Sequence, residues 1–149
     1  MKRVPSSELT PDSDCNDGVY YHEGKPFTGV SFTLHGNGKL RSETEFRDGL
    51  EWGQSKSWYP SGALAQELGA ARGALHGRKR QWHENGQLAF DEEWELGICV
   101  RRKQWNAQGA QEVDYTLQPT DRSFELLQSM RKWEARMGAA ESRAAPANE

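Results

Sequence analysis

Glycine and apolar positions recur along the chain with a period close to 24 residues. The glycines of one column are Gly38, Gly62, Gly86 and Gly109, and the apolar residues four positions before them are Leu34, Trp58, Trp82 and Trp105. Leu40, Leu64 and Leu88 follow the first three of these glycines by two positions. Columns that stay in phase over several copies indicate a repeat protein, in which each copy is one supersecondary unit.

Each copy has the pattern of a β-hairpin. A three-residue loop that ends in glycine, such as Glu84-Asn85-Gly86, separates the two apolar columns. Such a loop forms a type I turn followed by a left-handed residue, a conformation that glycine adopts without a Cβ clash. The loop also predicts the strand register. The predicted pairs are His83 with Gln87, Trp82 with Leu88, Arg80 with Phe90 and Arg78 with Glu92.

Successive side chains of a strand point to opposite faces of a sheet, so alternation predicts two different faces. The apolar face is expected to carry Val30, Phe32, Leu34, Leu40, Phe46, Trp58, Leu64, Leu68, Trp82, Leu88, Phe90, Trp94, Trp105, Val113 and Tyr115. The polar face is expected to carry Ser31, Thr33, Ser55, Ser57, Lys79, Gln81, Arg102, Gln104, Glu43, Glu45, Glu67, Asp91, Glu93 and Asp114. Cross-strand ion pairs are expected on this polar face between Lys79 and Asp91 and between Arg102 and Asp114.

A different pattern begins after residue 119. Phe124, Leu127, Met130, Trp133 and Met137 are spaced by three or four residues, which predicts an amphipathic helix over residues 120–137. Thr120 or Asp121 would cap its start, and Gly138 would end it. We therefore expect a mainly β chain: a disordered leader at 1–16, a single-layer antiparallel meander of β-hairpins at 17–117, the C-terminal helix, and a disordered tail at 138–149.

The composition explains why a thin sheet is expected. Leu, Ile, Val and Phe together number 23 of 149 residues, too few for the aliphatic strands of a buried parallel sheet. A net charge of −3 argues against a general nucleic-acid binder, so no direct nucleic-acid contact is expected. We also expect neither a transmembrane helix nor a secretory signal peptide. Cys15 and Cys99 form no metal or redox motif, and a reduced, cytoplasmic setting is expected, although a disulfide between them stays open.

These columns resemble the MORN repeat in its bacterial variant. The third copy matches the pattern most fully, with Gly77, Trp82, Gly86, Leu88, Trp94 and Gly97 at the recurring positions. The resemblance covers roughly residues 19–115 and departs from the pattern where Ala70 replaces an aromatic residue and Val100 replaces a glycine. It implies an antiparallel meander. It also implies a role as an antitoxin or immunity protein that neutralises a cognate toxin, such as a nuclease, by direct binding.

No group of residues predicts catalysis, a metal site or a cofactor, and we expect a protein that is not an enzyme. The sequence contains no nucleophile elbow, zinc-protease motif or phosphate-binding glycine loop. His35 and His83 share one column beside the turns, where we expect solvated side chains rather than a convergent set of metal ligands.

Two features are candidates for partner binding. Trp58, Trp82 and Trp105, with Arg80 beside them, could form a core, or could stay partly exposed as interface anchors. The acidic residues could be an ordinary solvated face, or could dock into a basic cleft of a toxin. These acidic residues are Glu43, Glu45, Glu67, Asp91 and Glu93.

An alternative is a MORN-type scaffold that binds an anionic membrane lipid or a structural partner. Its basis is the pair of basic runs that contain Arg78, Arg80, Arg101 and Lys103. Acidic residues are expected opposite these runs, so ion pairs within the sheet are favoured over a phosphate site, and a membrane partner is not expected.

Overall fold

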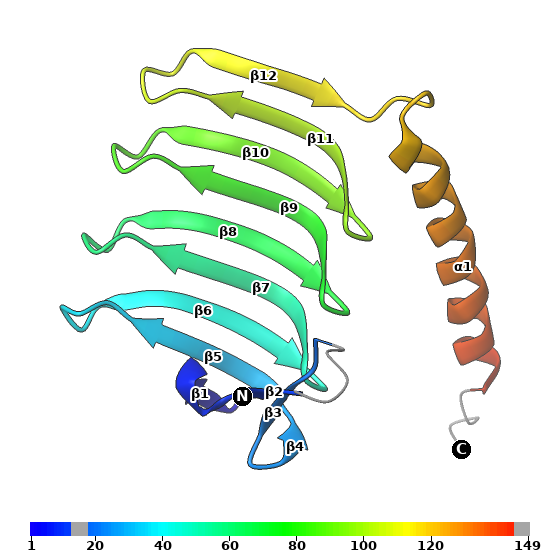
Figure 1. The fold of residues 1–149 in the computed structure, drawn as a ribbon, viewed down its shortest axis with the longest axis horizontal. Coiled ribbons are helices and arrows are strands. Elements are labelled where there is room, and N and C mark those ends of the chain that lie inside the picture. The colour runs from blue at the N-terminus through cyan, green and yellow to red at the C-terminus, as the bar shows by residue number, and fades with distance from the viewer. Residues whose placement is uncertain (13–17, 145–149) are drawn as a thin grey trace. The chain divides into compact units, whose positions relative to one another are not determined.

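The computed structural model describes residues 1–12 and 18–144, and the chain divides into two compact units, Met1–Thr116 and Leu117–Glu149. The first unit contains a nine-stranded sheet in the order β1-β5-β6-β7-β8-β9-β10-β11-β12 (Figure 1). Its strands are β1 (Arg3–Pro5), β5 (Gly29–Leu34), β6 (Leu40–Arg47), β7 (Leu50–Trp58), β8 (Leu64–Ala71), β9 (Ala74–Trp82), β10 (Leu88–Glu95), β11 (Ile98–Trp105) and β12 (Gln111–Thr116).

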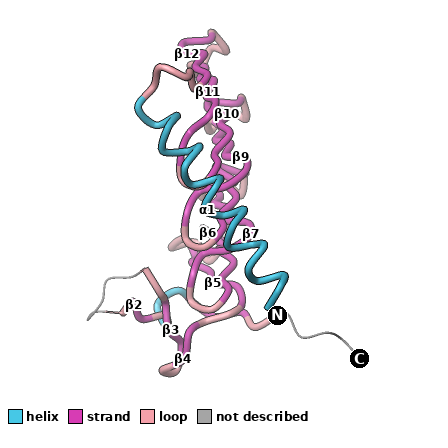
Figure 2. Tube along the Cα trace, turned by 90° about the vertical axis from the view of Figure 1, so that its right-hand side faces the viewer, coloured by secondary structure: helices cyan, strands magenta, loops and turns pink. Residues whose placement is uncertain are grey.

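The predicted meander is confirmed. From β5 to β12, each strand pairs antiparallel with the next strand in the chain, and the sheet is a single layer when seen edge-on (Figure 2). The three-residue turns are confirmed too: the backbone N–H of His83 donates to the carbonyl of Gln87 at 2.8 Å. Gly38, Gly62, Gly86 and Gly109 hold φ between 82° and 92°, the conformation that the glycine column supplies.

The strand register departs from the prediction three residues after the glycine of each of these turns. Trp82 lies opposite Leu88 as expected, but Phe90 lies opposite Gln81 instead of Arg80. The extra residue is Ala89, a β-bulge, and Arg41, Ala65 and Glu112 are skipped in the same way in the other hairpins. Leu40, Leu64 and Leu88, which come before the bulge, lie on the predicted face. Because a one-residue shift moves the rest of a strand to the other face, the predicted faces are wrong for the part of each second strand that follows the bulge.

The corrected faces mix apolar and charged residues. Residues directly opposite each other share a face, so Glu43, Glu67 and Asp91 lie on the face of Trp58 and Trp82. On the other face lie several residues expected beside the tryptophans, namely Phe46, Leu68, Phe90, Trp94, Val113 and Tyr115. The expected ion pairs are wrong for the same reason: Lys79 and Arg102 both pair with Glu92.

The turns at the opposite ends of the strands are tighter. Two residues connect each hairpin there, Asp48-Gly49, Arg72-Gly73 and Leu96-Gly97, and all six residues have positive φ. Positive φ at both central residues defines a type I′ turn, whose twist matches that of the flanking strands. Leu96 has φ 52°, in the left-handed region that a leucine adopts only at a cost.

The N-terminal residues form a cap on the first hairpin, which corrects the expected disordered leader for residues 3–11. They contain β1, the 3-10 helix η1 (Ser6–Glu8) and β2 (Thr10–Pro11). β1 pairs parallel with β5, and the N–H of Val30 donates to the carbonyl of Lys2 at 2.8 Å. β2 forms a small sheet with β3 (Tyr20–His22) and β4 (Lys25–Pro26). Residues 13–16 of the expected leader lie outside the described residues.

The buried core of the first unit lies at this capped end. Val4, Phe27 and Phe46 are each at most 7% exposed, with Leu9 and Tyr20 packed against them. The Phe27 and Phe46 ring centroids lie 5.8 Å apart. This cluster gives the N-terminal segment a reason to be ordered, because the apolar surface of Val4 and Leu9 is removed from water there.

The second unit contains one helix, α1 (Arg122–Ala144). It begins directly after Asp121, one of the two residues expected as a cap. It does not end at Gly138, so the predicted helix end and a tail disordered from residue 138 are wrong through residue 144. One internal glycine costs a helix only about 1 kcal/mol relative to alanine, and the alanine-rich segment after it favours continuation. Residues 145–149 of the expected tail lie outside the described residues.

The type I′ turn at Leu96 generates a stability prediction. Replacement Leu96→Asn is expected to raise the free energy of unfolding by about 1 kcal/mol, because asparagine tolerates the left-handed conformation better than leucine. Chemical denaturation of the full chain measures this change. Leu96→Ala is the control, since alanine relieves no backbone strain. A Leu96→Asn protein no more stable than Leu96→Ala contradicts the prediction.

Candidate protein-binding face

One face of the sheet, here called the tryptophan face, carries every residue that the sequence marked for partner binding. It is defined by the column Leu34, Trp58, Trp82 and Trp105, together with the residues that share its side of the strands. The acidic residues and the tryptophans were expected on opposite faces, and the bulges bring them together. The marked residues on this face are Glu43, Glu45, Glu67, Asp91, Glu93, Trp58, Trp82, Trp105 and Arg80.

Beside the tryptophan column runs a row of charges that alternate in sign. Each member lies opposite the next one on the neighbouring strand, from β6 to β12. This alternating row is Glu43, Lys56, Glu67, Arg80, Asp91, Lys103 and Asp114. Opposite charges that face each other across strands stabilise a sheet, by a few tenths to about 1 kcal/mol for each pair.

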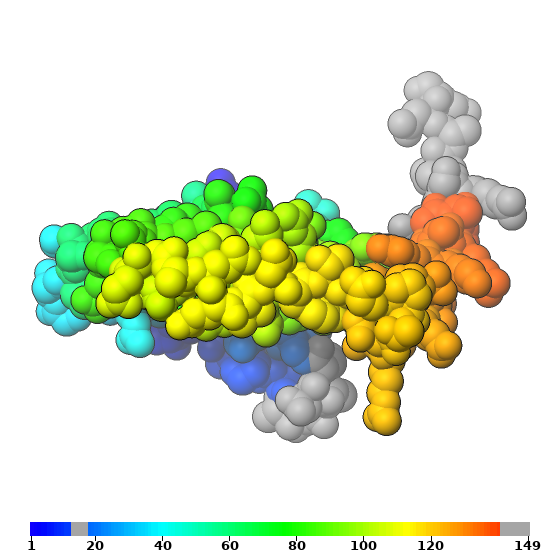
Figure 3. All heavy atoms as spheres, turned by 90° about the horizontal axis from the view of Figure 1, so that it is seen from above, coloured from blue at the N-terminus to red at the C-terminus, as the bar shows by residue number. Residues whose placement is uncertain are grey.

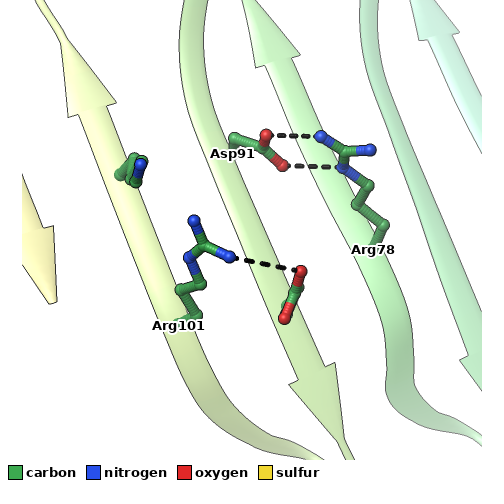
Figure 4. Close-up of a pocket in the computed structure, with 5 residues that line it drawn as sticks. Arg78, Asp91 and Arg101 are labelled. Carbon is green, nitrogen blue, oxygen red and sulfur yellow. Dashed lines mark hydrogen bonds and ion pairs between the residues drawn. The ribbon is translucent and has the colours of Figure 1, made fainter. Parts of the chain in front are cut away.

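Several charges of this face are already paired inside the chain. Arg3 pairs with Glu43, and Arg80 pairs with Glu67. The guanidinium of Arg78 on β9 donates two hydrogen bonds to the carboxylate of Asp91 on β10, from Nε at 2.8 Å and from Nη2 at 2.6 Å (Figure 4). The acidic residues therefore do not form a continuous anionic surface. They belong to a surface on which positive and negative charges alternate and nearly cancel.

A small hollow lies on the tryptophan face beside the alternating row. It has a volume of about 120 Å³ and is lined only by charged residues, Arg78, Asp91, Glu93, Arg101 and Lys103. Arg101 reaches from β11 to Glu93, with 3.9 Å between Nη1 and Oε1 (Figure 4). Because its carboxylates are held by arginines from the neighbouring strands, the hollow presents fixed donors and acceptors to a polar partner group.

The electrostatics of the hollow follow from the Arg78–Asp91 fork. The hydrogen bonds from Arg78 hold the pKa of Asp91 below its ordinary value, and the pKa of Arg78 is raised by the same contact. Hydrogen bonding to the charged form favours ionisation of a carboxyl group. Asp91 therefore stays an anion over a wider pH range than a free aspartate.

The tryptophan column itself is half-buried. Trp58, Trp82 and Trp105 are neither in a closed core nor fully exposed, and Leu34 at the end of the column is 52% exposed. The guanidinium of Arg80 lies 5.5 Å from the ring centroid of Trp82, within reach of a cation–π contact. An aromatic surface beside fixed arginines is the composition favoured at the centre of protein interfaces.

A second column, beside the turns, escaped the sequence reading. The side chains of His35, Tyr59 and His83 each donate a hydrogen bond to a carbonyl of the next copy. The acceptors are the carbonyls of Trp58, Trp82 and Trp105, at 2.7, 2.6 and 3.0 Å. The expected solvated histidines are thus structural links between copies. The sequence feature that marks these links is a histidine or tyrosine directly after each of Leu34, Trp58 and Trp82.

The other face contains a buried ion cluster that the sequence reading also missed. Glu92 is 3% exposed and lies near Lys79 and Arg102, and it accepts a hydrogen bond from the indole of Trp94 at 2.8 Å. Arg102 approaches it most closely, with 2.6 Å between Nε and Oε1. The ion pairs and the indole hydrogen bond account for a carboxylate buried on a sheet face.

In the part of the chain that the structure describes, no three His, Cys, Asp or Glu side chains are placed to hold a metal ion. Within the same residues, none of the helices combines the length and apolar character needed to cross a bilayer. Burial raises the pKa of the Cys99 thiol on β11, so it is less ionised at neutral pH than an ordinary cysteine.

The paired Asp91 predicts a pH-dependent stability. Since its pKa is lower in the folded chain, its stabilisation is present above the unfolded pKa and is lost as the pH falls through the folded pKa. Asp91→Asn is expected to lower the free energy of unfolding by about 1 kcal/mol at pH 7, with the difference vanishing in acid. Urea denaturation at a series of pH values measures it. Asp114→Asn, which removes a carboxylate with no ion pair in the described residues, is the control; an equal loss in both variants contradicts the prediction.

Comparison with known protein families identifies one of the copies. Residues 75–95 match the family model of the MORN repeat variant, and this segment covers most of β9, the turn at Gly86 and β10. No curated protein and no solved structure matches the chain. The same hairpin, turn and bulge recur on both sides of the matched copy. The match and the repetition together support a MORN-repeat protein.

Proposed function

We propose that this chain is a protein-binding scaffold, and that its partner is a cognate toxin, which it neutralises by covering a surface that the toxin needs. The observation that carries the binding role is the half-buried tryptophan column beside the alternating charge row. The resemblance to short bacterial MORN-type immunity proteins supports the toxin as the partner. The proposal places the protein in the cytoplasm, where a toxin would otherwise act.

The tryptophan face has the physical properties that binding needs. Trp82 and Arg80 belong to the residue types that contribute most at protein interfaces. The side chains of Arg78 and Arg80 are held by ion pairs to carboxylates before any partner arrives, so less conformational entropy is lost on binding. Alternating charges also penalise a partner that docks one strand out of register, since like charges then meet.

A protein partner is favoured over an anionic lipid by the arrangement of the cations. Arg78, Arg80 and Arg101 do lie on one face, but each is paired with a carboxylate on a neighbouring strand. A bilayer surface of uniform negative charge would have to approach those carboxylates as well. A protein surface can place opposite charges against both signs.

The first test is capture and protection. The product of the gene next to this one is co-expressed with the full chain, and we expect the two to co-purify and the chain to restore growth of cells in which that product is toxic. Sedimentation with anionic liposomes at low salt is measured in parallel. A chain that neither binds nor protects against the neighbouring product removes the toxin proposal, and sedimentation with liposomes instead supports the lipid alternative.

The second test locates the binding face with a charge exchange. The double variant Glu67→Arg with Arg80→Glu keeps an ion pair between the same strands but reverses the order of signs that a partner meets. The exchange also places like charges opposite Lys56 and Asp91, so we expect a folded chain of lower stability. We expect at least tenfold weaker partner binding, measured by calorimetry, because like charges then face each other across the interface.

A pair of tryptophan substitutions, one on the tryptophan face and one on α1, tests the same face with a matched control. Trp82→Ala is expected to weaken binding by tenfold or more, as truncation of an aromatic anchor does. Trp133→Ala removes an exposed tryptophan from α1 and is expected to leave binding unchanged. Equal effects of the two substitutions, or full binding by the charge-exchange variant, would place the interface elsewhere.

A further inference from the structure

The two edges of the sheet are treated differently. At one edge, β1 covers β5 along Arg3–Pro5 with backbone pairing. At the other edge, β12 pairs with β11, and none of the strands in the described residues lies on its outer side. Figure 3 looks onto this edge and shows β12, in yellow, with no other strand in front of it. An uncovered edge presents backbone N–H and C=O groups that can pair with another extended chain.

The alternating row stops at this edge on Asp114, a carboxylate that has a cation on one side only, Lys103 on β11. Asp114 is exposed and forms no ion pair in the described residues. Its neighbour in the row is Lys103, which lies between Asp91 on β10 and Asp114 on β12. The two acidic residues in the interior of the row, Glu67 and Asp91, each have a cation on both neighbouring strands. The next position beyond Asp114 therefore favours a cation.

A second copy of this chain fits the edge poorly in the two registers centred on Val113 and Asp114. Antiparallel pairing of two β12 strands about Val113 places Glu112 of each copy against Asp114 of the other. Pairing about Asp114 places that carboxylate against its own equivalent. Like charges directly opposite each other destabilise strand pairing, so the charges of β12 disfavour self-association while leaving the edge open to an oppositely charged strand.

We propose that the edge of β12 accepts an extended basic strand of a partner protein, with a Lys or Arg opposite Asp114. Side chains alternate along the added strand, so the residues next to that cation lie on the other face, beside Val113 and Tyr115. The recognised feature is the cation opposite Asp114. This inference rests on the protein-binding role proposed above but uses the sheet edge, and its test does not require the toxin.

The probe is a peptide with the sequence of residues 75–82, Leu-His-Gly-Arg-Lys-Arg-Gln-Trp. Within the chain, this strand already places Arg80 opposite acidic residues on both neighbouring strands, Glu67 and Asp91. The peptide is added to the isotope-labelled full chain, and backbone amide signals are followed by NMR. We expect the signals of Gln111–Thr116 to move and the binding to weaken with salt.

Charge exchange makes the test specific. Asp114→Lys in the protein is expected to weaken peptide binding about tenfold, and a peptide carrying Arg80→Glu is expected to lose about the same with the unchanged protein. Combining the two changes should restore binding. Asp48→Lys, at an exposed turn, is the control and should leave the titration unchanged.

Three results would overturn the edge proposal. They are no movement of the β12 signals up to about 1 mM peptide, equal binding by the Asp114→Lys protein, and movement confined to the tryptophan face. The spectrum of each variant shows directly whether it is folded. If the edge proposal fails, the toxin proposal still stands, because toxin binding is tested through Trp82 and Arg80. If the toxin proposal fails, the peptide titration still tests the edge.

Discussion

One extra residue in the second strand of each hairpin determines what this sheet presents to its surroundings. Ala89 is skipped in the register between Trp82–Leu88 and Gln81–Phe90, and the other hairpins repeat the irregularity. Without it, the carboxylates would lie behind the tryptophans, giving an apolar face and an acidic one. With it, the acidic residues of the alternating row lie opposite cations next to the tryptophan column. The bulge thus converts a conventional two-sided sheet into a surface on which aromatic anchors and alternating charges lie together.

In the described part of Met1–Thr116, the main sheet is a single layer, and its strands are held together chiefly by contacts with neighbouring strands. The closely packed apolar cluster of the first unit, with Phe27 and Phe46 at its centre, is confined to the capped end. Farther along, neighbouring copies are joined by ion pairs such as Arg80–Glu67 and by hydrogen bonds from His83-type side chains to the next copy. Such local contacts are typical of repeat proteins, whose stability is approximately a sum over neighbouring units.

The sequence was sufficient for those features that depend on local chemistry. Glycine at Gly86 and its equivalents requires a left-handed residue, and this requirement predicted the turns, the strands and the period. The bulges could not be predicted, because Arg41, Ala65, Ala89 and Glu112 share no property that marks them. The N-terminal cap was also missed, since β1 pairs with a strand more than twenty residues away and carries no repeat signature. The role of these residues in partner binding stays a prediction, and the sequence could not show that the bulges bring the acidic residues and the tryptophans to one face.

The two ends of a repeat array face different physical problems. The first hairpin is closed by the parallel strand β1 and by the aromatic cluster behind it, so its backbone groups are paired. At β12 the array ends on Asp114 and Glu112, which oppose pairing with an identical strand without removing the edge. Charge on an edge strand protects against indiscriminate pairing and at the same time defines which strand can be added. Since the alternating row reaches its last strand with a carboxylate exposed, the sign pattern that stabilises the sheet internally also sets the charge that a strand added there must carry.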